Sequence, residues 1–307
     1  MRYIDLKEIS IKTLKQQKEL HISIKNSVDD EKLNIINQKA MKGNEVFVLI
    51  FLSKTVTISV LEKISNVSHI SLLPNYENPL ENLNELSNFN LKSLILGSFT
   101  KKSISFKPMN CTNLEKLEFL EGLGNKSQYE FINKQKRLRK LHLKSLDLVL
   151  VEKNENLTDL YVHSNLKSEN WLPEKFPNLQ KLHLHGLSRL NNHSFIESLE
   201  KLESINISYN SHLVSFPKLN NPKLIKSIEM YTCPNFNDVE SLLRYENLER
   251  LVLTSYDKPL QMSSDDFSKL KNLSKLKTVY TAWGKKSKDE VNKIQQIYAE
   301  TGWINHQ

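Results

Sequence analysis

One apolar pattern recurs along most of the chain. It has the form L-x-x-L-x-L, with Ile, Val, Met or Phe allowed at the three L positions, and successive copies start 19 to 25 residues apart. A single match means little in a chain with many leucines, but ten copies in step predict a repeat protein. In the tenth copy, Thr278 replaces the last apolar residue. The copies begin at Val67, Leu91, Leu114, Leu138, Leu157, Leu179, Leu202, Ile225, Leu248 and Leu273.

The spacing within each copy predicts a strand with one buried face, because the fourth and sixth positions are apolar and their neighbours are mostly polar. The first position continues that face from the preceding turn. A unit of this length cannot bury its own apolar face, so neighbouring units must stack to form a core. Short amphipathic segments between the strands predict helices of one or two turns at 192–199, 237–243 and 265–270.

This repeat resembles that of the leucine-rich repeat family, whose units continue as L-x-x-L-x-L-x-x-N/C-x-L. The resemblance covers about residues 43–283, and Asn165, Asn210 and Cys233 fill the Asn/Cys position. It implies an α/β solenoid that is curved, with a parallel concave sheet and short helices or 3-10 turns on the convex side. In the family, the Asn side chain bonds to the backbone where the chain leaves the strand. Other residues occupy that position in several copies, namely Phe99, Gly122, Leu146, Leu187 and Tyr256.

The two ends of the chain differ from the repeats, as expected of caps on a solenoid. Residues 1–66 form the predicted N-terminal cap, with strands at 20–24 and 46–48 and a helix from Asp30 to Lys42 that closes at Gly43. Residues 67–283 are the repeats. Residues 284–307 form the C-terminal cap, with a helix over 288–301, a stop at Gly302 and Trp303 packed onto the last repeat. We therefore expect one domain over residues 1–307.

Composition makes several classes of protein improbable. Only 7 of 307 residues are glycine, and neither G-x-G-x-x-G nor G-x-x-x-x-G-K-[ST] occurs, which disfavours enzymes that cradle phosphates. No catalytic constellation stands out, so we expect no enzyme and no cofactor. The longest apolar stretch, Val46–Leu52, is too short to span a bilayer. Two cysteines and the lack of a signal-like segment favour a cytoplasmic protein.

The repeat register also predicts which side chains point away from the core. Positions three, five and seven face outward and form three columns across neighbouring strands, which lie about 4.8 Å apart. Six histidines and tyrosines gather in the middle of these columns, flanked by lysines, and we predict a partner-binding patch there. Its residues are Glu118, Lys140, His142, Tyr161, His163, Lys181, His183, His185, Asn206 and Tyr231.

Three interpretations of this patch are open. Exposed strand positions tolerate histidine and tyrosine without any selected role. Alternatively, the rings form a protein-recognition surface, since both side chains combine a rigid apolar body with a polar tip. A metal site is the third, because His183 and His185 share one face with His163 beside them. No fourth ligand has a fixed place, and we assign no metal.

We therefore predict a monomeric module, of bacterial type, that binds a protein partner on its concave face. A toxin-neutralising or effector-type role is a narrower hypothesis that rests on analogy of fold. The alternative is a nucleic-acid-binding protein, suggested by the net charge of +8 and by one column of basic residues. That column comprises Lys116, Lys140, Lys181, Arg250 and Lys275. A membrane partner is not expected.

Overall fold

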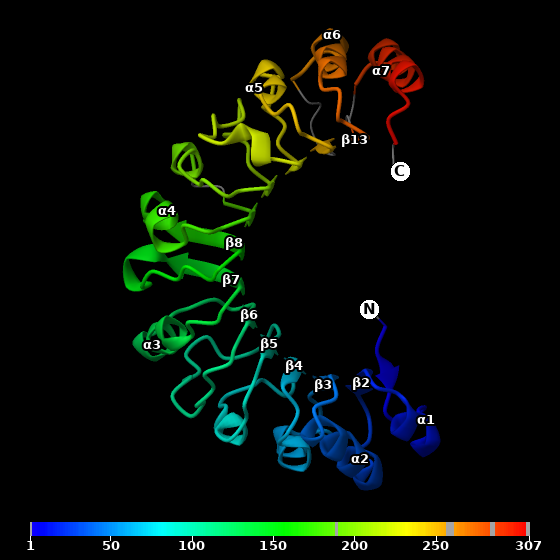
Figure 1. Cartoon of the computed structure of the whole chain (residues 1–307), viewed down its shortest axis with the longest axis vertical. Helices are drawn as coiled ribbons and strands as arrows, with labels where there is room; N and C mark the ends of the chain where they lie inside the picture. Colours follow the sequence, from blue (N-terminus) through cyan, green and yellow to red (C-terminus); the bar gives the residue numbers. More distant parts are fainter. Residues whose placement is uncertain (1, 188–189, 256–260, 283–285, 305–307) are drawn as a thin grey trace. The chain divides into compact units, whose positions relative to one another are not determined.

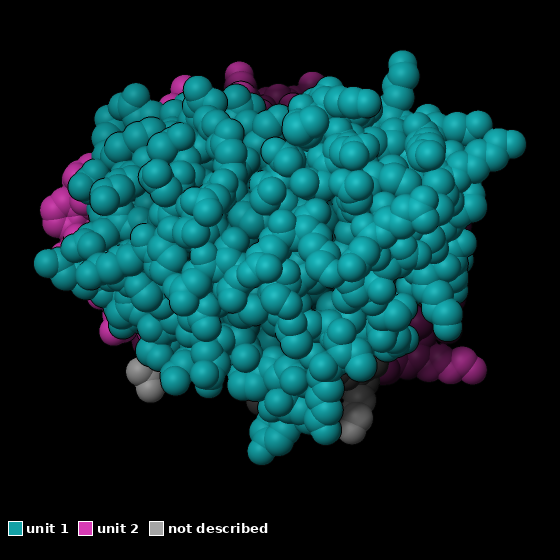
Figure 2. Space-filling view, turned by 90° about the horizontal axis from the view of Figure 1, so that it is seen from below, with its two compact units in different colours: residues 1–146, 150–156 teal, residues 147–149, 157–307 magenta. Residues whose placement is uncertain are grey.

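A computed structural model of the chain describes residues 2–187, 190–255, 261–282 and 286–304 (Figure 1). It contains two compact units, drawn in separate colours in Figure 2. Unit 1 comprises residues 1–146 and 150–156, and unit 2 comprises residues 147–149 and 157–307. The single domain expected over 1–307 stays a prediction. Tyr256 and residues 284, 285 and 305–307 of the predicted cap lie outside the described residues.

Unit 1 is a run of parallel strands in chain order, each paired with the next. The strands are β1 (Ile4–Asp5), β2 (Leu20–Ile24), β3 (Val46–Phe51), β4 (His69–Leu73), β5 (Ser93–Leu96), β6 (Lys116–Phe119) and β7 (Lys140–Asp147). Figure 1 shows the strands of this unit along one face and its helices along the opposite face. They are α1 (Ile11–Gln16), α2 (Asp30–Met41) and α3 (Lys126–Lys134), with 3-10 turns η1 (Ile58–Ile64) and η2 (Asn84–Leu86). A further turn, η3 (Leu148–Leu150), follows β7 in the chain.

Unit 2 repeats the same arrangement, with helices of four or five residues apart from the C-terminal one. Its parallel strands are β8 (Asp159–Lys167), β9 (Lys181–His185), β10 (Ser204–Ser208), β11 (Ser227–Tyr231), β12 (Arg250–Thr254) and β13 (Thr278–Ala282). Its helices are α4 (Leu172–Lys175), α5 (Glu240–Leu243), α6 (Ser264–Ser268) and α7 (Lys288–Thr301). Its 3-10 turns are η4 (Glu169–Trp171), η5 (Ser194–Ile196), η6 (Pro222–Leu224) and η7 (Lys269–Asn272). The short helices predicted at 192–199, 237–243 and 265–270 are confirmed as η5, α5, and α6 with η7.

The core follows the repeat. In the first nine copies, the residues at positions one, four and six are at most 2% exposed, so each strand buries the face that the pattern predicts. Nearly complete burial of such side chains contributes about 1.5–3 kcal/mol each relative to leaving them exposed. Because each strand pairs with its sequence neighbours, this burial is shared between adjacent repeats.

The tenth copy begins three residues later than the pattern predicts. Leu251 pairs with Val279 and Leu253 with Thr281, so Val279 holds position four and Leu276, not Leu273, holds position one. Leu273 instead closes the turn after η7, where its amide donates to the Leu270 carbonyl at 2.9 Å. The register of β13 therefore places Thr278, not Lys275, in the third-position column. The prediction that Lys275 belongs to that basic column is wrong.

The helices predicted near both ends of the chain are present. Helix α2 ends one residue before Lys42, and Gly43 adopts a φ of 82°; helix α7 ends at Thr301, and Gly302 adopts a φ of 67°. Trp303 is buried, with its ring centroid 5.8 Å from that of Phe267 in α6, and it thereby joins the cap to the last repeat. No described helix is both long enough and apolar enough to cross a membrane.

The Asn/Cys position is structural at two of its three predicted places. The Oδ1 of Asn210 accepts the amides of His212 and Leu213, at 2.8 and 3.1 Å, in the turn after β10. The thiol of Cys233 donates to the Ile207 carbonyl. Asn165 does not fit, because β8 continues through it to Lys167 and leaves its side chain exposed.

Candidate binding surfaces

The outward positions of the strands are open to solvent in most repeats. In β9, Leu182 and Leu184 are buried, whereas Lys181, His183 and His185 are partly or fully exposed. A few residues at positions three, five and seven are nevertheless covered by their neighbours. Ser71 and Ser208 are buried, and so are both Val252 and Thr254 in β12.

The ten predicted patch residues fall into two sets. Seven lie in unit 2, on β8 to β11, and three lie in unit 1, on β6 and β7. We describe each set within its own unit. The three in unit 1 are Glu118, Lys140 and His142; the seven in unit 2 are Tyr161, His163, Lys181, His183, His185, Asn206 and Tyr231.

In unit 2, five rings form a connected group, which we name the ring cluster: Tyr161, His163, His183, His185 and Tyr209. Tyr161 stacks on His183 with centroids 5.5 Å apart. His185 meets the edge of His163 at 4.4 Å and that of Tyr209 at 4.9 Å. The strand pairing explains the contacts, since Tyr161 lies opposite His183 and His163 opposite His185.

Tyr209 is the member of the ring cluster that the repeat columns did not predict. It follows the seventh position and has a left-handed φ of 56°, which turns its ring back toward His185. It is 55% exposed. The outward columns end at position seven, so they do not include Tyr209. Its only sequence signal is that an aromatic residue directly follows that position.

Two rings of the cluster, His185 and Tyr161, are shifted toward their neutral forms. Burial lowers the pKa of His185, and the neighbouring His163 lowers it further. Burial raises the pKa of Tyr161, which also favours the neutral form of that side chain. The cluster therefore offers flat rings with polar tips, which are partly buried at Tyr161, His183 and His185 and exposed at His163 and Tyr209.

Beside the ring cluster, Glu229 organises a set of polar side chains in unit 2. The Nε of Arg250 donates to Glu229 at 2.7 Å, and the Nδ2 of Asn206 donates to the same carboxylate at 3.0 Å. Ser208 donates to Asn206 in turn. Burial and Glu229 together raise the pKa of Tyr231. We name Asn206, Glu229, Tyr231 and Arg250 the Glu229 network; it holds two predicted patch residues in place.

In unit 1, Glu118 is the centre of a smaller group. It accepts from Lys116 at 2.7 Å and lies 3.6 Å from the Nδ1 of His142 on the next strand. The interaction with His142, together with that of Lys116, outweighs burial and lowers the pKa of Glu118 to about 2. Lys140 is exposed at the edge of this group.

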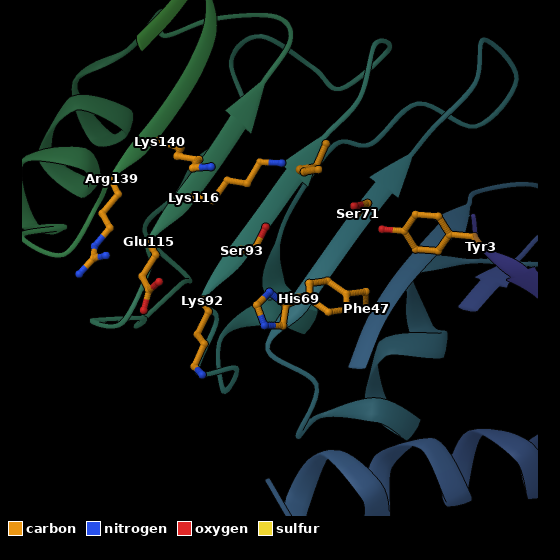
Figure 3. A pocket seen from close by; sticks show the side chains of 11 residues that line it. Tyr3, Phe47, His69, Ser71, Lys92, Ser93, Glu115, Lys116, Arg139 and Lys140 are labelled. Atoms are coloured by element: carbon orange, nitrogen blue, oxygen red, sulfur yellow. The ribbon is translucent and has the colours of Figure 1, made fainter. Parts of the chain in front are cut away.

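Unit 1 also carries a hollow that the sequence did not predict (Figure 3). Its volume is about 430 Å³, and we name it the basic hollow. Cationic side chains form one end and rings the other. It is lined by Tyr3, Phe47, His69, Ser71, Lys92, Ser93, Ile95, Glu115, Lys116, Arg139 and Lys140.

The hollow forms because a small side chain stands between larger ones in a row that crosses neighbouring strands. Phe47, His69, Ser93 and Lys116 stand opposite one another on β3 to β6, so a serine separates the rings from the lysines. Phe47 and His69 pack with centroids 4.2 Å apart. Tyr3, from the N-terminal segment, shares a hydrogen bond with Ser71, and Figure 3 shows the Ser71 side chain next to the Tyr3 hydroxyl.

The signal for the hollow was present in positions that the columns left out. Lys92, Glu115 and Arg139 occupy position two of successive repeats, and Phe47 lies on an atypical strand ahead of the first copy. Position two lies at the start of each strand. There the backbone carbonyl accepts the amide of position two in the next repeat; the Arg139 amide, for example, donates to the Glu115 carbonyl at 2.8 Å. Burial lowers the pKa of His69, so the positive charge of the hollow comes from its lysines and arginine.

Comparison with solved structures decides the fold. An internalin of Listeria monocytogenes superposes over 94% of this chain and 78% of its own, with a TM-score of 0.51 and 16% identity. The chain has the leucine-rich repeat fold. A leucine-rich repeat protein of Leptospira interrogans is also similar, at 16% identity and a TM-score of 0.47 over 97% of this chain and 92% of its own. No family model matches the sequence. No curated protein matches it either.

The leucine-rich repeat strands do not bring a metal-ligand set together within the described parts of the chain. No group of three or more His, Cys, Asp or Glu residues in those parts is arranged to hold a metal ion. The ring cluster has its histidines packed edge to face rather than aimed at a common point, as the 84° angle between His163 and His185 shows.

Proposed function

We propose that this leucine-rich repeat chain is a non-catalytic module that binds a protein partner through outward strand residues. The ring cluster carries the proposal. Half-buried aromatic rings with polar tips are the residues that contribute most at protein interfaces, because they lose little conformational entropy and bury much area. The Glu229 network beside it supplies oriented polar groups. All ten predicted patch residues remain our proposed contacts, and Tyr209 joins them.

The test is a double substitution at the centre of the cluster. Tyr161→Glu with His183→Glu places two carboxylates where the rings stack, and we expect the affinity for a purified partner to fall about 30-fold or more. Trp171→Glu is the matched control, because Trp171 is also a partly exposed ring of unit 2 but lies on η4, away from the strands. Circular dichroism checks that both variants fold. Undiminished binding by the double variant would refute the surface.

The nucleic-acid alternative loses support from the ion pairs of the basic column. Lys116 lies 2.7 Å from Glu118, Lys181 lies 4.0 Å from Asp159, and Arg250 lies 2.7 Å from Glu229. These carboxylates compete with phosphates for the same cations, so the column is a face of mixed charge. Fluorescence titration with a labelled oligonucleotide at low salt separates the alternatives, since a phosphate-binding face would give tight binding that falls steeply with added salt.

The proposal includes a cytoplasmic, monomeric protein of bacterial type. Cys111 and Cys233 are free and buried, and burial raises the pKa of their thiols to about 11 and about 12. Such thiols react slowly and suit a reducing compartment. A toxin-neutralising or effector-type role stays the narrower form of the proposal.

A further inference from the structure

The basic hollow of unit 1 has two chemically different ends. Tyr3, Phe47 and His69 form a ring end. At the other end, four cations face a single lining carboxylate, that of Glu115. Among the described residues, neither Lys92 nor Lys140 takes part in an ion pair, so both can receive an anion at no cost to an existing contact. The cationic residues of this end are Lys92, Lys116, Arg139 and Lys140.

The length of the hollow limits what could fill it. Phe47 and Lys140 stand in one column of paired residues, four strand spacings apart. At about 4.8 Å per spacing, the two ends are about 19 Å apart. An extended peptide of about six residues covers that distance, at roughly 3.3 Å per residue. A single phosphate or carboxylate would reach only one end.

We propose that the basic hollow binds an extended acidic segment of a protein partner, with carboxylates on Lys92 and Lys140 and an aromatic side chain against Phe47. This inference rests on the proposed function, because it names the chemistry of one part of the partner. Charge complementarity selects the acidic segment, and the ring end selects its aromatic residue. The lining carboxylate of Glu115 and the Lys116–Glu118 pair disfavour a continuous phosphate backbone.

The test uses a peptide of seven glutamates with one tyrosine at its end, labelled with fluorescein at the other end, titrated with the intact protein and followed by anisotropy. We expect wild-type protein to bind it, and Lys92→Glu with Lys140→Glu to weaken binding about tenfold or more. Lys226→Glu with Lys277→Glu is the control, since both lysines hold repeat position two in unit 2 and neither is a proposed contact. Replacing the peptide's tyrosine with alanine should weaken binding about two- to tenfold.

Three outcomes would overturn the inference: no binding by the wild-type protein, equal losses in the two lysine pairs, or tighter binding of a single-stranded oligothymidine than of the peptide. The ring-cluster variant separates this inference from the proposed function. If Tyr161→Glu with His183→Glu binds the peptide normally but loses the partner, both proposals stand. If that variant keeps the partner while the Lys92 and Lys140 pair loses the peptide, only the ring-cluster surface fails.

Discussion

Individual residues in left-handed backbone show how the chain manages with few glycines. Turns that leave the strands need a positive φ, and glycine meets that need at Gly122 and Gly186. Elsewhere, other residues take the same conformation at a cost of about 1–2 kcal/mol each. They are Phe99, Ser168, Tyr209 and Thr232, with φ between 54° and 67°; Ser164, with a φ of 97°, lies within β8. The scarcity of glycine therefore reflects tolerated strain, not the absence of turns that favour it.

Thr232 is the clearest case of such strain, because its branched Cβ suits a φ of 54° poorly. We predict that Thr232→Asn raises the free energy of unfolding by about 0.5–1 kcal/mol, since asparagine tolerates this conformation. Urea denaturation measures the change. Thr232→Val keeps the branched side chain and should give no gain. A loss of stability in the Asn variant would show that the Thr232 hydroxyl matters more than the backbone.

At the scale of the repeat element, side chains link neighbouring turns in two ways. One is the buried turn around Asn210. The other is an edge ladder at the position before each repeat's first apolar residue, where Asn113 donates to Asn90 and accepts from Arg137. Lys275 donates to Asn247 at that same position, which agrees with the corrected register of β13. The family pattern draws attention to the Asn/Cys position, whereas the asparagines that link these repeats stand just before the first apolar residue.

The buried turn after β10 predicts a pH effect on stability. The Nδ2 of Asn210 donates to the Nε2 of His193, so the ring must be neutral, and burial lowers the pKa of His193 to about 4. The unfolded chain binds a proton near pH 6.5, whereas the folded chain does so only near pH 4. Stability is therefore complete above pH 6.5 and falls by about 2–3 kcal/mol as the pH drops to 4.

Urea denaturation between pH 7 and pH 4 measures this loss. The matched variant is His193→Gln, whose Oε1 can accept from Asn210 without titrating. We expect its stability to vary less with pH than that of the wild type over this range. Parallel pH profiles for the two proteins would assign the acid sensitivity to other groups. Glu118 is not one of them above pH 4.5, because its pKa is lowered from 4.5 to about 2.

At the scale of the whole molecule, the sequence predicted the fold far better than the surface. Periodic burial repeats ten times, so an error in one copy, as at Leu273, leaves the architecture intact. Binding surfaces lack that redundancy: Tyr209 depends on one unusual φ, and the basic hollow depends on Ser71 and Ser93 being small between larger neighbours. Tyr3 lies far from the hollow's other residues in the chain, and no periodicity connects them.

A repeat protein that is stabilised between neighbours should open from its ends, and the C-terminal cap tests this. Trp303 packs against Phe267 and Tyr298, and the next residue, Ile304, bridges to Thr278 of β13. We predict that Trp303→Ala costs about 3 kcal/mol or more, with amides of β13 losing protection from hydrogen exchange before those of β9. Trp303→Phe should keep most of the protection, because its ring still fills part of the site. Equal loss along β9 and β13 would mean that unit 2 unfolds as one cooperative block, so that its cap stabilises every repeat alike.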